Sequence, residues 1–381
     1  MKFIHTSDWH IGRQFHNVSL LEDQQHVLEQ IIEYIKAESV DVLVIAGDIY
    51  DRAVPPAMAV ELLDYVLNQI CSEMKVPVIL IPGNHDSAER LSFGARQLKH
   101  AGLHIMGNLR KITEPVVIKV DENVVNFYGI PYTDPEHVRD KYDEPVVNHD
   151  EAHAFLVEKI KSTLNKDETN VLISHCFIDG GEESDSERPL SIGGVDRVLP
   201  QHFKAFDYVA LGHLHRPQSK GEDYIRYSGS ILKYSFSEKN HKKGITLVEV
   251  EKNSLKSFNH LPLEPLRDMR EIEGEIETII EQGRIDPHPH DYLLVRLTDK
   301  HAILNAMAKL REVYPNVLHL EKPGIMEGNE KQQVQREMLK ASEFDMFRDF
   351  FKQVSGSDLT PDQDEALKDV INGLSRDDTE T

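Results

Sequence analysis

The sequence predicts an α/β fold for most of the chain, because apolar runs alternate with amphipathic helical segments through its first half. Five of these runs end in residues that can bind a metal ion. Near residues 261–266 two prolines interrupt the pattern, and shorter modules follow. These observations predict a large metal-binding α/β domain, a small second domain and a C-terminal segment.

Hydrophobic periodicity defines the predicted elements of the first hundred residues. Apolar side chains recur at helical spacing across residues 20–37, and the continuous apolar run at 42–46 is typical of a fully buried strand. Pro55 and Pro56 begin a further helix, since proline is favoured in a helix's first turn. This part is predicted to contain strands at 2–7, 42–46 and 78–81 and helices at 20–37, 56–74 and 88–101.

From residue 116 the pattern changes to a predicted hairpin and then returns to alternation. Residues 121–123 form the expected hairpin turn. Residues 179–196 are rich in Gly, Ser and acidic residues, which predicts a long loop beside the candidate ligands. The predicted elements are strands at 116–120 and 124–130, a helix at 150–164, and strands beginning at 171 and 208 and covering 224–228 and 245–250.

After the prolines the segments predict a small α+β module and a helical tail. Phe344, Phe347, Phe351 and Val354 recur at three- and four-residue intervals, so this helix either packs on its own domain or docks on a partner. The module is expected from segments 270–280, 292–297, 302–314 and 317–320, and the tail from helices at 333–354 and 360–374. We therefore expect domains at 1–260, 261–328 and 329–381.

Composition indicates a globular protein of the cytoplasm. Hydrophobic residues make up 40% of the chain, which is enough for a core. No run approaches the roughly 20 apolar residues of a membrane span, the first residues lack the apolar segment of a signal peptide, and two cysteines fit a reducing compartment. The net charge of -22 argues against a general phosphate-binding surface. Any polyanion must be held locally, by metal charge or by a partner subunit.

The five run endings read, in order, D-x-H, G-D-x-x-D, G-N-H-D, a single His and G-H-x-H. In an open α/β sheet the carboxyl ends of the strands meet at one crevice, so we expect these five loops to converge. The endings supply two carboxylates, four imidazoles and one amide. These are more ligands than one tetrahedral ion can bind, and they suit two ions that share Asp48. The candidate metal ligands are Asp8, His10, Asp48, Asn84, His175, His213 and His215.

Such a site would suit phosphate chemistry inside an acidic protein. Two divalent ions bring four positive charges, and Asp8 with Asp48 return only two, which leaves a positive site. A pair of ions can activate a water and clamp the attacking and leaving oxygens of a phosphoryl displacement. His85 follows Asn84 and is placed to face the substrate, where it could protonate the departing oxygen or stabilise charge.

Other conspicuous residues are interpreted without a functional role. Trp9 lies between two candidate ligands and is expected to pack beneath the site. Cys71 is expected to be a small buried hydrophobe, and Cys176, next to His175, is not expected to be a metal ligand because the neighbouring carboxylates and amide suit harder metals. The run at 239–243 holds three lysines and is expected to be a solvated turn. His288 and His290 alternate with prolines in a loop without carboxylates, so no metal is expected there.

The order of these motifs resembles the calcineurin-like metallophosphoesterase superfamily. Within it, the sequence is similar to the SbcD family, the bacterial nuclease subunit of the double-strand-break processing complex, over most of residues 1–251. The similarity rests on the segments His5-Thr6-Ser7-Asp8-Trp9-His10-Ile11-Gly12, Gly47-Asp48-Ile49-Tyr50-Asp51 with Pro55-Pro56, Tyr227-Ser228-Gly229-Ser230 and Ser235-Phe236-Ser237-Glu238.

The resemblance implies a two-sheet α/β/β/α sandwich and two manganese ions, with magnesium as the alternative. It assigns His85 to catalysis, the small domain to capping the site and admitting DNA, and the C-terminal helices to docking on the coiled coil of the ATPase partner SbcC. It also implies homodimers joined through residues 56–74 and 88–101. The implied ligand sets are Asp8, His10, Asp48 and His215 for one ion and Asp48, Asn84, His175 and His213 for the other.

The implied activities are ATP-dependent exonuclease action on double-stranded ends and endonuclease action on single strands and hairpins, in DNA replication, repair and recombination. One departure is informative, because some relatives carry a second histidine where this chain has Asp51. We expect Asp51 to orient His85 instead. The sequence contains no G-x-x-x-x-G-K-[ST] phosphate loop, so ATP hydrolysis must come from another chain.

Two other classes of function remain as alternatives to a DNA nuclease. A metallophosphatase or phosphodiesterase acting on a non-DNA substrate is favoured by Asp51-Arg52, which resembles the G-D-x-x-D-R-G signature of protein phosphatases. Ala53 and Asp86 depart from that pattern. An interaction scaffold with a vestigial metal site ranks last, because every ligand type is intact.

Overall fold

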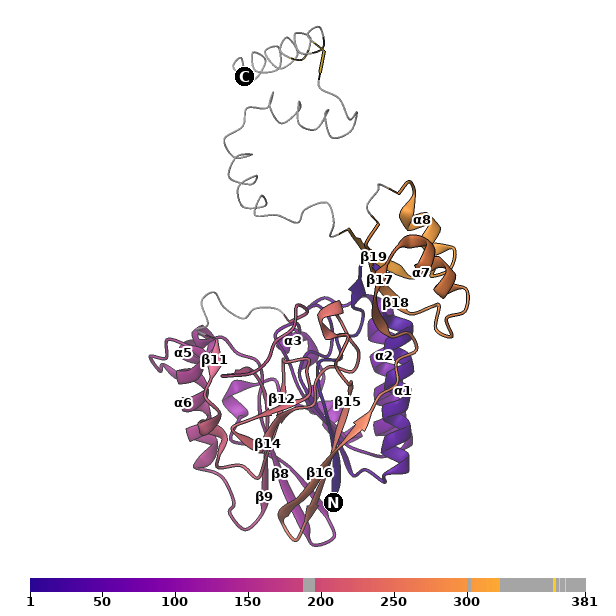
Figure 1. Ribbon diagram of the computed structural model, residues 1–381. Coiled ribbons are helices and arrows are strands. Elements are labelled where there is room, and N and C mark those ends of the chain that lie inside the picture. Colours follow the sequence, from indigo (N-terminus) through magenta and orange to yellow (C-terminus); the bar gives the residue numbers. More distant parts are fainter. Residues whose placement is uncertain (188–195, 300–302, 323–358, 361–362, 364–366, 368–381) are drawn as a thin grey trace.

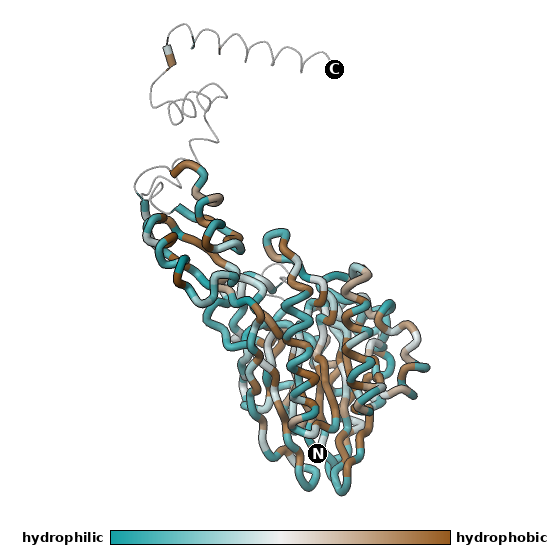
Figure 2. Tube along the Cα trace, turned by 90° about the vertical axis from the view of Figure 1, so that its right-hand side faces the viewer, coloured by the Kyte–Doolittle hydropathy of each residue, from teal (hydrophilic) through white to brown (hydrophobic). Residues whose placement is uncertain are grey.

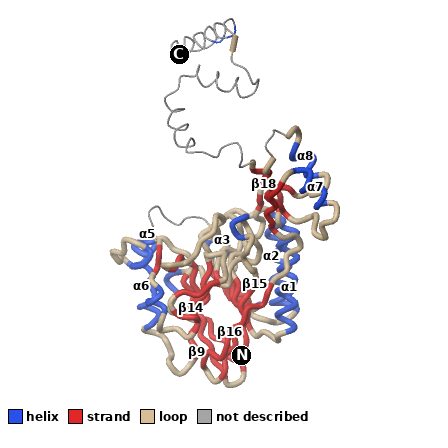
Figure 3. The backbone as a smooth tube through the Cα atoms, in the orientation of Figure 1, coloured by secondary structure: helices blue, strands red, loops and turns tan. Residues whose placement is uncertain are grey.

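The computed structural model describes residues 1–187, 196–299, 303–322, 359–360, 363 and 367. A large α/β domain carries the N-terminus, and a small domain sits at one of its corners (Figure 1). In the large domain two sheets lie face to face with helices outside both (Figure 3). This arrangement confirms the predicted α/β/β/α sandwich.

The first sheet has six strands in the order β16-β15-β1-β4-β5-β6. Strands β1, β4, β5 and β6 run parallel, and β15 and β16 extend the sheet as antiparallel strands. Their bounds are β1 Lys2–Thr6, β4 Val42–Ala46, β5 Val78–Ile81, β6 Leu103–Ile105, β15 Gly244–Glu251 and β16 Ser254–Pro262. Helices α1 (Leu21–Ala37) and α2 (Ala57–Leu67) cover its outer face.

The second sheet also has six strands, in the order β13-β14-β12-β9-β8-β7. The four central strands are parallel, and both edge strands are antiparallel to their neighbours. Their bounds are β7 Val116–Val120, β8 Asn123–Ile130, β9 Thr169–His175, β12 Tyr208–Gly212, β13 Gln218–Lys220 and β14 Glu222–Tyr227. Helices α5 (Pro135–Tyr142) and α6 (His149–Lys161) lie on its outer face (Figure 1).

Strand alternation explains why the sandwich has three cores. Val44 of β4 and Ile173 of β9 point into the space between the sheets, whereas Ile45 and Leu172 point outward to the helices. Both faces of the central strands are therefore buried, which is why their sequences are continuous apolar runs. The tube in Figure 2 shows these hydrophobic strands behind helices of mixed polarity.

The small domain alternates strand and helix. Its elements are β17 (Met269–Gly274), α7 (Ile276–Gly283), β18 (Tyr292–Leu297), α8 (Ala306–Arg311) and β19 (Val317–Glu321). All three strands run parallel, so each helix makes the crossover between neighbouring strands. Helix and strand therefore alternate in this region, rather than being segregated as in an α+β module.

Two predicted helices are more irregular than expected. The expected helix at 88–101 is divided into α3 (Ala88–Leu91), α4 (Ala95–Leu98) and the 3-10 turn η2 (Lys99–Ala101). Gly94 separates α3 from α4 with a left-handed φ of 72°, which no continuing helix can accommodate. The expected helix at 56–74 continues beyond α2 as a π-helical turn, η1 (Asn68–Glu73).

The predicted tail helices at 333–354 and 360–374 fall outside the described residues, apart from a few isolated positions. Among the helices that the structure describes, none is both long enough and apolar enough to cross a membrane.

Helix α6 buries a histidine that should make stability depend on pH. His153 donates from Nδ1 to the His149 carbonyl at 2.9 Å, while its Nε2 finds no hydrogen-bond partner among the described residues. Burial lowers the pKa of His153 from 6.5 to about 4. The unfolded chain therefore binds a proton at His153 more readily than the folded protein does. The contribution of neutral His153 to the free energy of unfolding is fully present above pH 6.5 and is lost as the pH falls toward 4.

We expect His153→Leu to remove this part of the pH dependence. Between pH 6.5 and pH 5 the parent should lose about 2 kcal/mol of unfolding free energy more than the variant. Denaturant unfolding at several pH values measures the difference. Equal slopes for the parent and the variant would contradict the prediction.

Candidate metal centre

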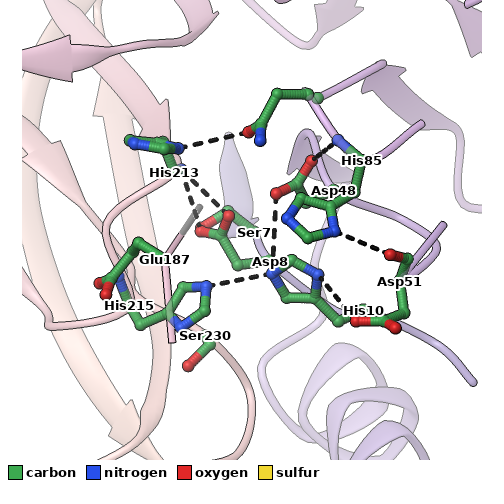
Figure 4. Close-up of polar contacts among 12 residues, drawn as sticks. Ser7, Asp8, His10, Asp48, Asp51, His85, Glu187, His213, His215 and Ser230 are labelled. Atoms are coloured by element: carbon green, nitrogen blue, oxygen red, sulfur yellow. Dashed lines mark hydrogen bonds and ion pairs between the residues drawn. The ribbon is translucent and has the colours of Figure 1, made fainter. Parts of the chain in front are cut away.

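The predicted ligands follow parallel strands of both sheets and meet at one edge of the sandwich. Asp8 and His10 follow β1, Asp48 follows β4, and Asn84 and His85 follow β5. From the second sheet, His175 ends β9, and His213 and His215 follow β12. Figure 4 shows side chains from the two sheets pointing toward one another across this edge. The convergence follows from topology, because the carboxyl ends of parallel strands share an edge.

Asp48 lies at the middle of the cluster. Its Oδ2 is 3.6 Å from Nε2 of His10 and 3.6 Å from Nε2 of His175. On one side, Nε2 of His10 lies 3.0 Å from Nε2 of His215. On the other, Oδ1 of Asn84 lies 2.9 Å from Nε2 of His175 and 3.3 Å from Nδ1 of His213. The side chains thus form two groups that share Asp48.

The protonation pattern at His175 fits a bound cation. Its Nδ1 lies 2.9 Å from the Ala46 carbonyl oxygen, which can only accept, so Nδ1 carries the proton and Nε2 presents a lone pair. That lone pair faces the Asn84 carbonyl oxygen, which is also an acceptor. Two acceptors at this distance repel each other unless a cation lies between them. Imidazole, carboxylate and amide oxygen together suit a divalent ion such as manganese.

The pKa values of the buried ligands also favour a bound cation. Burial, together with the charge of Asp48, holds the pKa of Asp8 well above its ordinary value. Burial and neighbouring imidazoles hold the pKa values of His10 and His213 well below their ordinary value, and burial lowers the pKa of His175. Neutral imidazoles are the form that binds metal. Two buried carboxylates without a cation are unfavourable, and a divalent ion would relieve their repulsion.

Four of these residues have left-handed backbones. The φ angles are 52° at Asp8, 45° at His10, 50° at Asp48 and 111° at His213. Residues other than glycine rarely adopt such angles, and each instance costs on the order of 1 to 3 kcal/mol. Other left-handed residues occur in turns elsewhere, but strain of this kind at buried ligand loops is typical of functional sites whose surroundings hold the loops in place.

His85 is held by main-chain contacts. Its backbone N–H donates to Oδ1 of Asp48 at 2.9 Å, and its ring Nδ1 donates to the Asp51 carbonyl oxygen at 2.7 Å. Nε2 therefore remains available. Asp51 contacts the His85 ring through its main-chain carbonyl, and the Asp51 carboxylate pairs with Arg13 at 3.3 Å.

Asp86 supports two of the ligand loops, a role that the sequence interpretation missed although the G-N-H-D motif contains this residue. Its carboxylate accepts the backbone N–H groups of Ile49, Tyr50 and Gly83 at 2.9 to 3.0 Å. Burial and the charge of Asp48 raise the pKa of Asp86 to about 7. It thereby ties the loop after β4 to the loop after β5.

The remaining residues near the site have structural roles. Trp9 is buried and donates to the Thr6 hydroxyl at 3.0 Å, as expected for packing beneath the site. Burial raises the pKa of the Cys176 thiol to about 12, so it stays protonated and is a poor ligand. The expected solvated turn at 239–243 is wrong for Lys243, which is buried beside the Glu238 carboxylate.

Comparisons with known proteins identify two matching family models and several similar proteins. The model of the calcineurin-like phosphoesterase family matches residues 1–217, and that of the type 5 capsule protein repressor C-terminal domain matches residues 265–355. The SbcD subunit of the SbcCD nuclease of Staphylococcus epidermidis is 35% identical over 373 residues, which cover 98% of both chains. The SbcD subunit of Staphylococcus saprophyticus is 35% identical over 375 residues, again 98% of both chains. The match with a dimetal phosphatase from Danio rerio covers 69% of this chain and 98% of the phosphatase chain, at 12% identity and a TM-score of 0.39.

The phosphoesterase match spans more than half of the chain, so the fold and the site together define a calcineurin-like metallophosphoesterase. Both staphylococcal relatives exceed 30% identity across nearly the whole length. The chain therefore belongs to the SbcD family of nuclease subunits.

Proposed function

We propose that the protein is a metal-dependent DNA nuclease subunit that hydrolyses phosphodiester bonds. The observation that carries the proposal is the convergence of five strand ends around Asp48, where Nε2 of His175 and the carbonyl oxygen of Asn84 face each other at 2.9 Å. Two manganese ions are the proposed cofactors. One would be held by Asp8, His10, Asp48 and His215, and the other by Asp48, Asn84, His175 and His213.

When bound, the ions would activate a water molecule and stabilise charge on phosphate oxygens. The protein's own groups position the remaining chemistry. The Asp51 carbonyl fixes His85 with Nε2 unoccupied, and Asp48 fixes the His85 backbone. We assign to His85 contact with the phosphoryl group or protonation of the departing oxygen. A phosphatase acting on another substrate is less well supported, because both full-length relatives are nuclease subunits.

Partners follow from the family. We propose that the protein acts with a coiled-coil ATPase of the SbcC type on DNA in the cytoplasm, with the segment at 329–381 as the docking element and the small domain as a cap. Full activity on duplex ends should then require the ATPase and ATP, since this sequence has no phosphate loop.

His85→Ala is expected to abolish nuclease turnover while it leaves bound manganese near the parent value, because His85 is not among the proposed ligands. Activity is measured on single-stranded DNA, duplex ends and a small phosphomonoester, with and without the ATPase. Metal content is measured in parallel. Loss of both ions in the variant would contradict the assignment of His85 to the substrate side.

An apolar surface between α2 and α4 supports a homodimer. Val60 on α2 is 44% exposed, and Phe93 just before α4 is 87% exposed. A groove of about 570 Å³ lies between these elements, lined by Val60, Leu63, Leu91 and Leu98 among others. Contiguous exposed apolar surface of this kind marks an interface, and we propose a second copy of the chain as its occupant.

Val60→Asp and Phe93→Asp are each expected to convert a dimer into monomers, because a charge would be buried without a partner at the interface. Sedimentation velocity at several concentrations measures the outcome. The exposed Val117→Asp on β7, 45% exposed and outside the groove, is the matched control. A parent that is monomeric at all concentrations would exclude this interface.

A further inference from the structure

The Nδ1 side of the His215 ring contacts two buried polar residues that are not among the predicted ligands. The hydroxyl of Ser186 lies 2.6 Å from Nδ1 of His215 and also contacts Oε1 of Glu238. The Glu238 side chain is completely buried, and its Oε1 lies 3.5 Å from the same ring nitrogen. Ser186 and Glu238 are 52 residues apart in sequence, so only the fold brings them together.

The direction of the hydrogen bonds follows from the chemistry of each group. Lys243 donates to Oε2 of Glu238, to the Ser230 hydroxyl at 2.8 Å and to the His215 carbonyl at 2.7 Å. Facing an ammonium group, Glu238 is a carboxylate and can only accept. Ser186 must therefore give its proton to Glu238, and its oxygen accepts the proton on Nδ1 of His215. Nε2 of His215 is left with a lone pair that points toward His10, at 3.0 Å.

We propose that Glu238 is a positioning residue that acts through Ser186 to hold His215 as the Nδ1–H tautomer and to present Nε2 to the metal. The proposal rests on the metal centre described above. A partner that fixes the tautomer and the ring orientation of a ligating histidine raises metal affinity, and its loss typically costs about 10- to 100-fold.

The surroundings leave the ring as the only adjustable part of His215. Its backbone N–H donates to Oε1 of Glu187 at 2.8 Å, and its carbonyl accepts from Lys243. Glu187 fixes the N–H independently of Glu238, whereas Lys243, which fixes the carbonyl, is itself paired with Glu238. Ser186→Ala therefore tests the ring contact without disturbing either main-chain group. Glu238 and Ser186, which together form the relay to Nδ1, determine which ring nitrogen of His215 faces the metal centre.

Glu238 ends the short turn η5 (Phe236–Glu238), which is also held from the small domain. Lys239, the next residue, pairs with Glu271 of β17, and Lys233 pairs with Asp268 at 2.7 Å. These ion pairs anchor the segment without touching His215. Glu271→Gln is therefore a matched control, because it loosens the segment but leaves the relay intact.

The test uses the full chain without nucleic acid. Ser186→Ala removes the link and keeps the buried pair of Glu238 and Lys243, whereas Glu238→Gln removes the charge. Imidazole nitrogen chemical shifts of the metal-free protein report the tautomer of His215, and titration calorimetry measures manganese affinity. We expect only Nδ1–H in the parent and in Glu271→Gln. In the other two variants the Nε2–H tautomer should appear, with manganese binding about 10- to 100-fold weaker.

Two results would overturn the proposal. One is parental manganese affinity in both Ser186→Ala and Glu238→Gln. The other is weakened affinity with the Nδ1–H tautomer retained in both, which would make the residues merely structural. If Glu238→Gln does not fold, Ser186→Ala carries the test. A parent that binds no manganese would refute the proposed function, while the tautomer measurement would still judge the relay.

Discussion

Replacing Asp48 by asparagine is expected to lower nuclease activity by about 1,000-fold or more and to reduce bound manganese from two ions to at most one. Asp48 is the residue shared by the two groups of side chains, with Oδ2 equally distant from His10 and His175. An asparagine offers one carbonyl oxygen and no charge, so it cannot serve two ions. The measurements are turnover on single-stranded DNA and metal content by mass spectrometry.

The same substitution should not destabilise the metal-free protein. Asp8 is buried, and the charge of Asp48 adds to the effect of burial in raising the pKa of Asp8. Removing one of two buried like charges relieves that repulsion, so the metal-free variant should unfold at no lower temperature than the parent. Asp223→Asn, at an exposed position on β14, is the control for the chemical change itself. Parental activity with two bound ions in Asp48→Asn would end the dinuclear assignment.

The apolar runs of the sequence predicted the α/β alternation of strands and helices, whereas the two-sheet sandwich was implied by the family resemblance. Central strands such as β4 and β9 are buried on both faces and read as unbroken apolar runs. The side chains that follow them lie at the edge where parallel strands end, so strand ends alone place the candidate ligands together. Neither argument requires knowledge of which strands are neighbours within a sheet or of how the two sheets pack together.

Residues that support the site were missed because their roles depend on contacts between distant segments. Lys243 belongs to a run of polar residues that looks solvated, yet folding buries it against Glu238 and the loop at His215. Ser186 lies in a loop of ordinary polar composition, and only its position beside His215 gives it a role. A pattern in one segment carries no information about which other segment will cover it.

Local backbone conformation explains the misjudged helix at 88–101. Its residues have helical periodicity on average, but Gly94 can take a left-handed φ at little cost and ends the helix within two turns. Phe93 is then exposed on the proposed dimer surface rather than packed in the core. Periodicity predicts which side chains share a face, and a single glycine can divide that face.

Gly212→Ala is expected to prevent assembly of the site. A Cβ at this position would lie 1.8 Å from the Ala46 carbonyl oxygen and 2.9 Å from Nδ1 of His175. Gly212 ends β12 in the second sheet and Ala46 ends β4 in the first, so the methyl group must push the sheets apart where the ligands meet. We expect unfolding free energy to fall by about 3 kcal/mol or more and manganese binding to be lost.

The matched control is Gly274→Ala in β17, where the nearest atom to an added Cβ is Cγ1 of Ile279 at 3.6 Å, an ordinary contact. Its effect on unfolding free energy should stay within about 1 kcal/mol. Both variants are compared by denaturant unfolding and by manganese titration. The Ala46 carbonyl is also the acceptor that fixes the tautomer of His175, so loss of metal should exceed what the loss of stability explains. If Gly212→Ala binds two ions with parental affinity, the close approach of the two sheets is not what builds the metal centre.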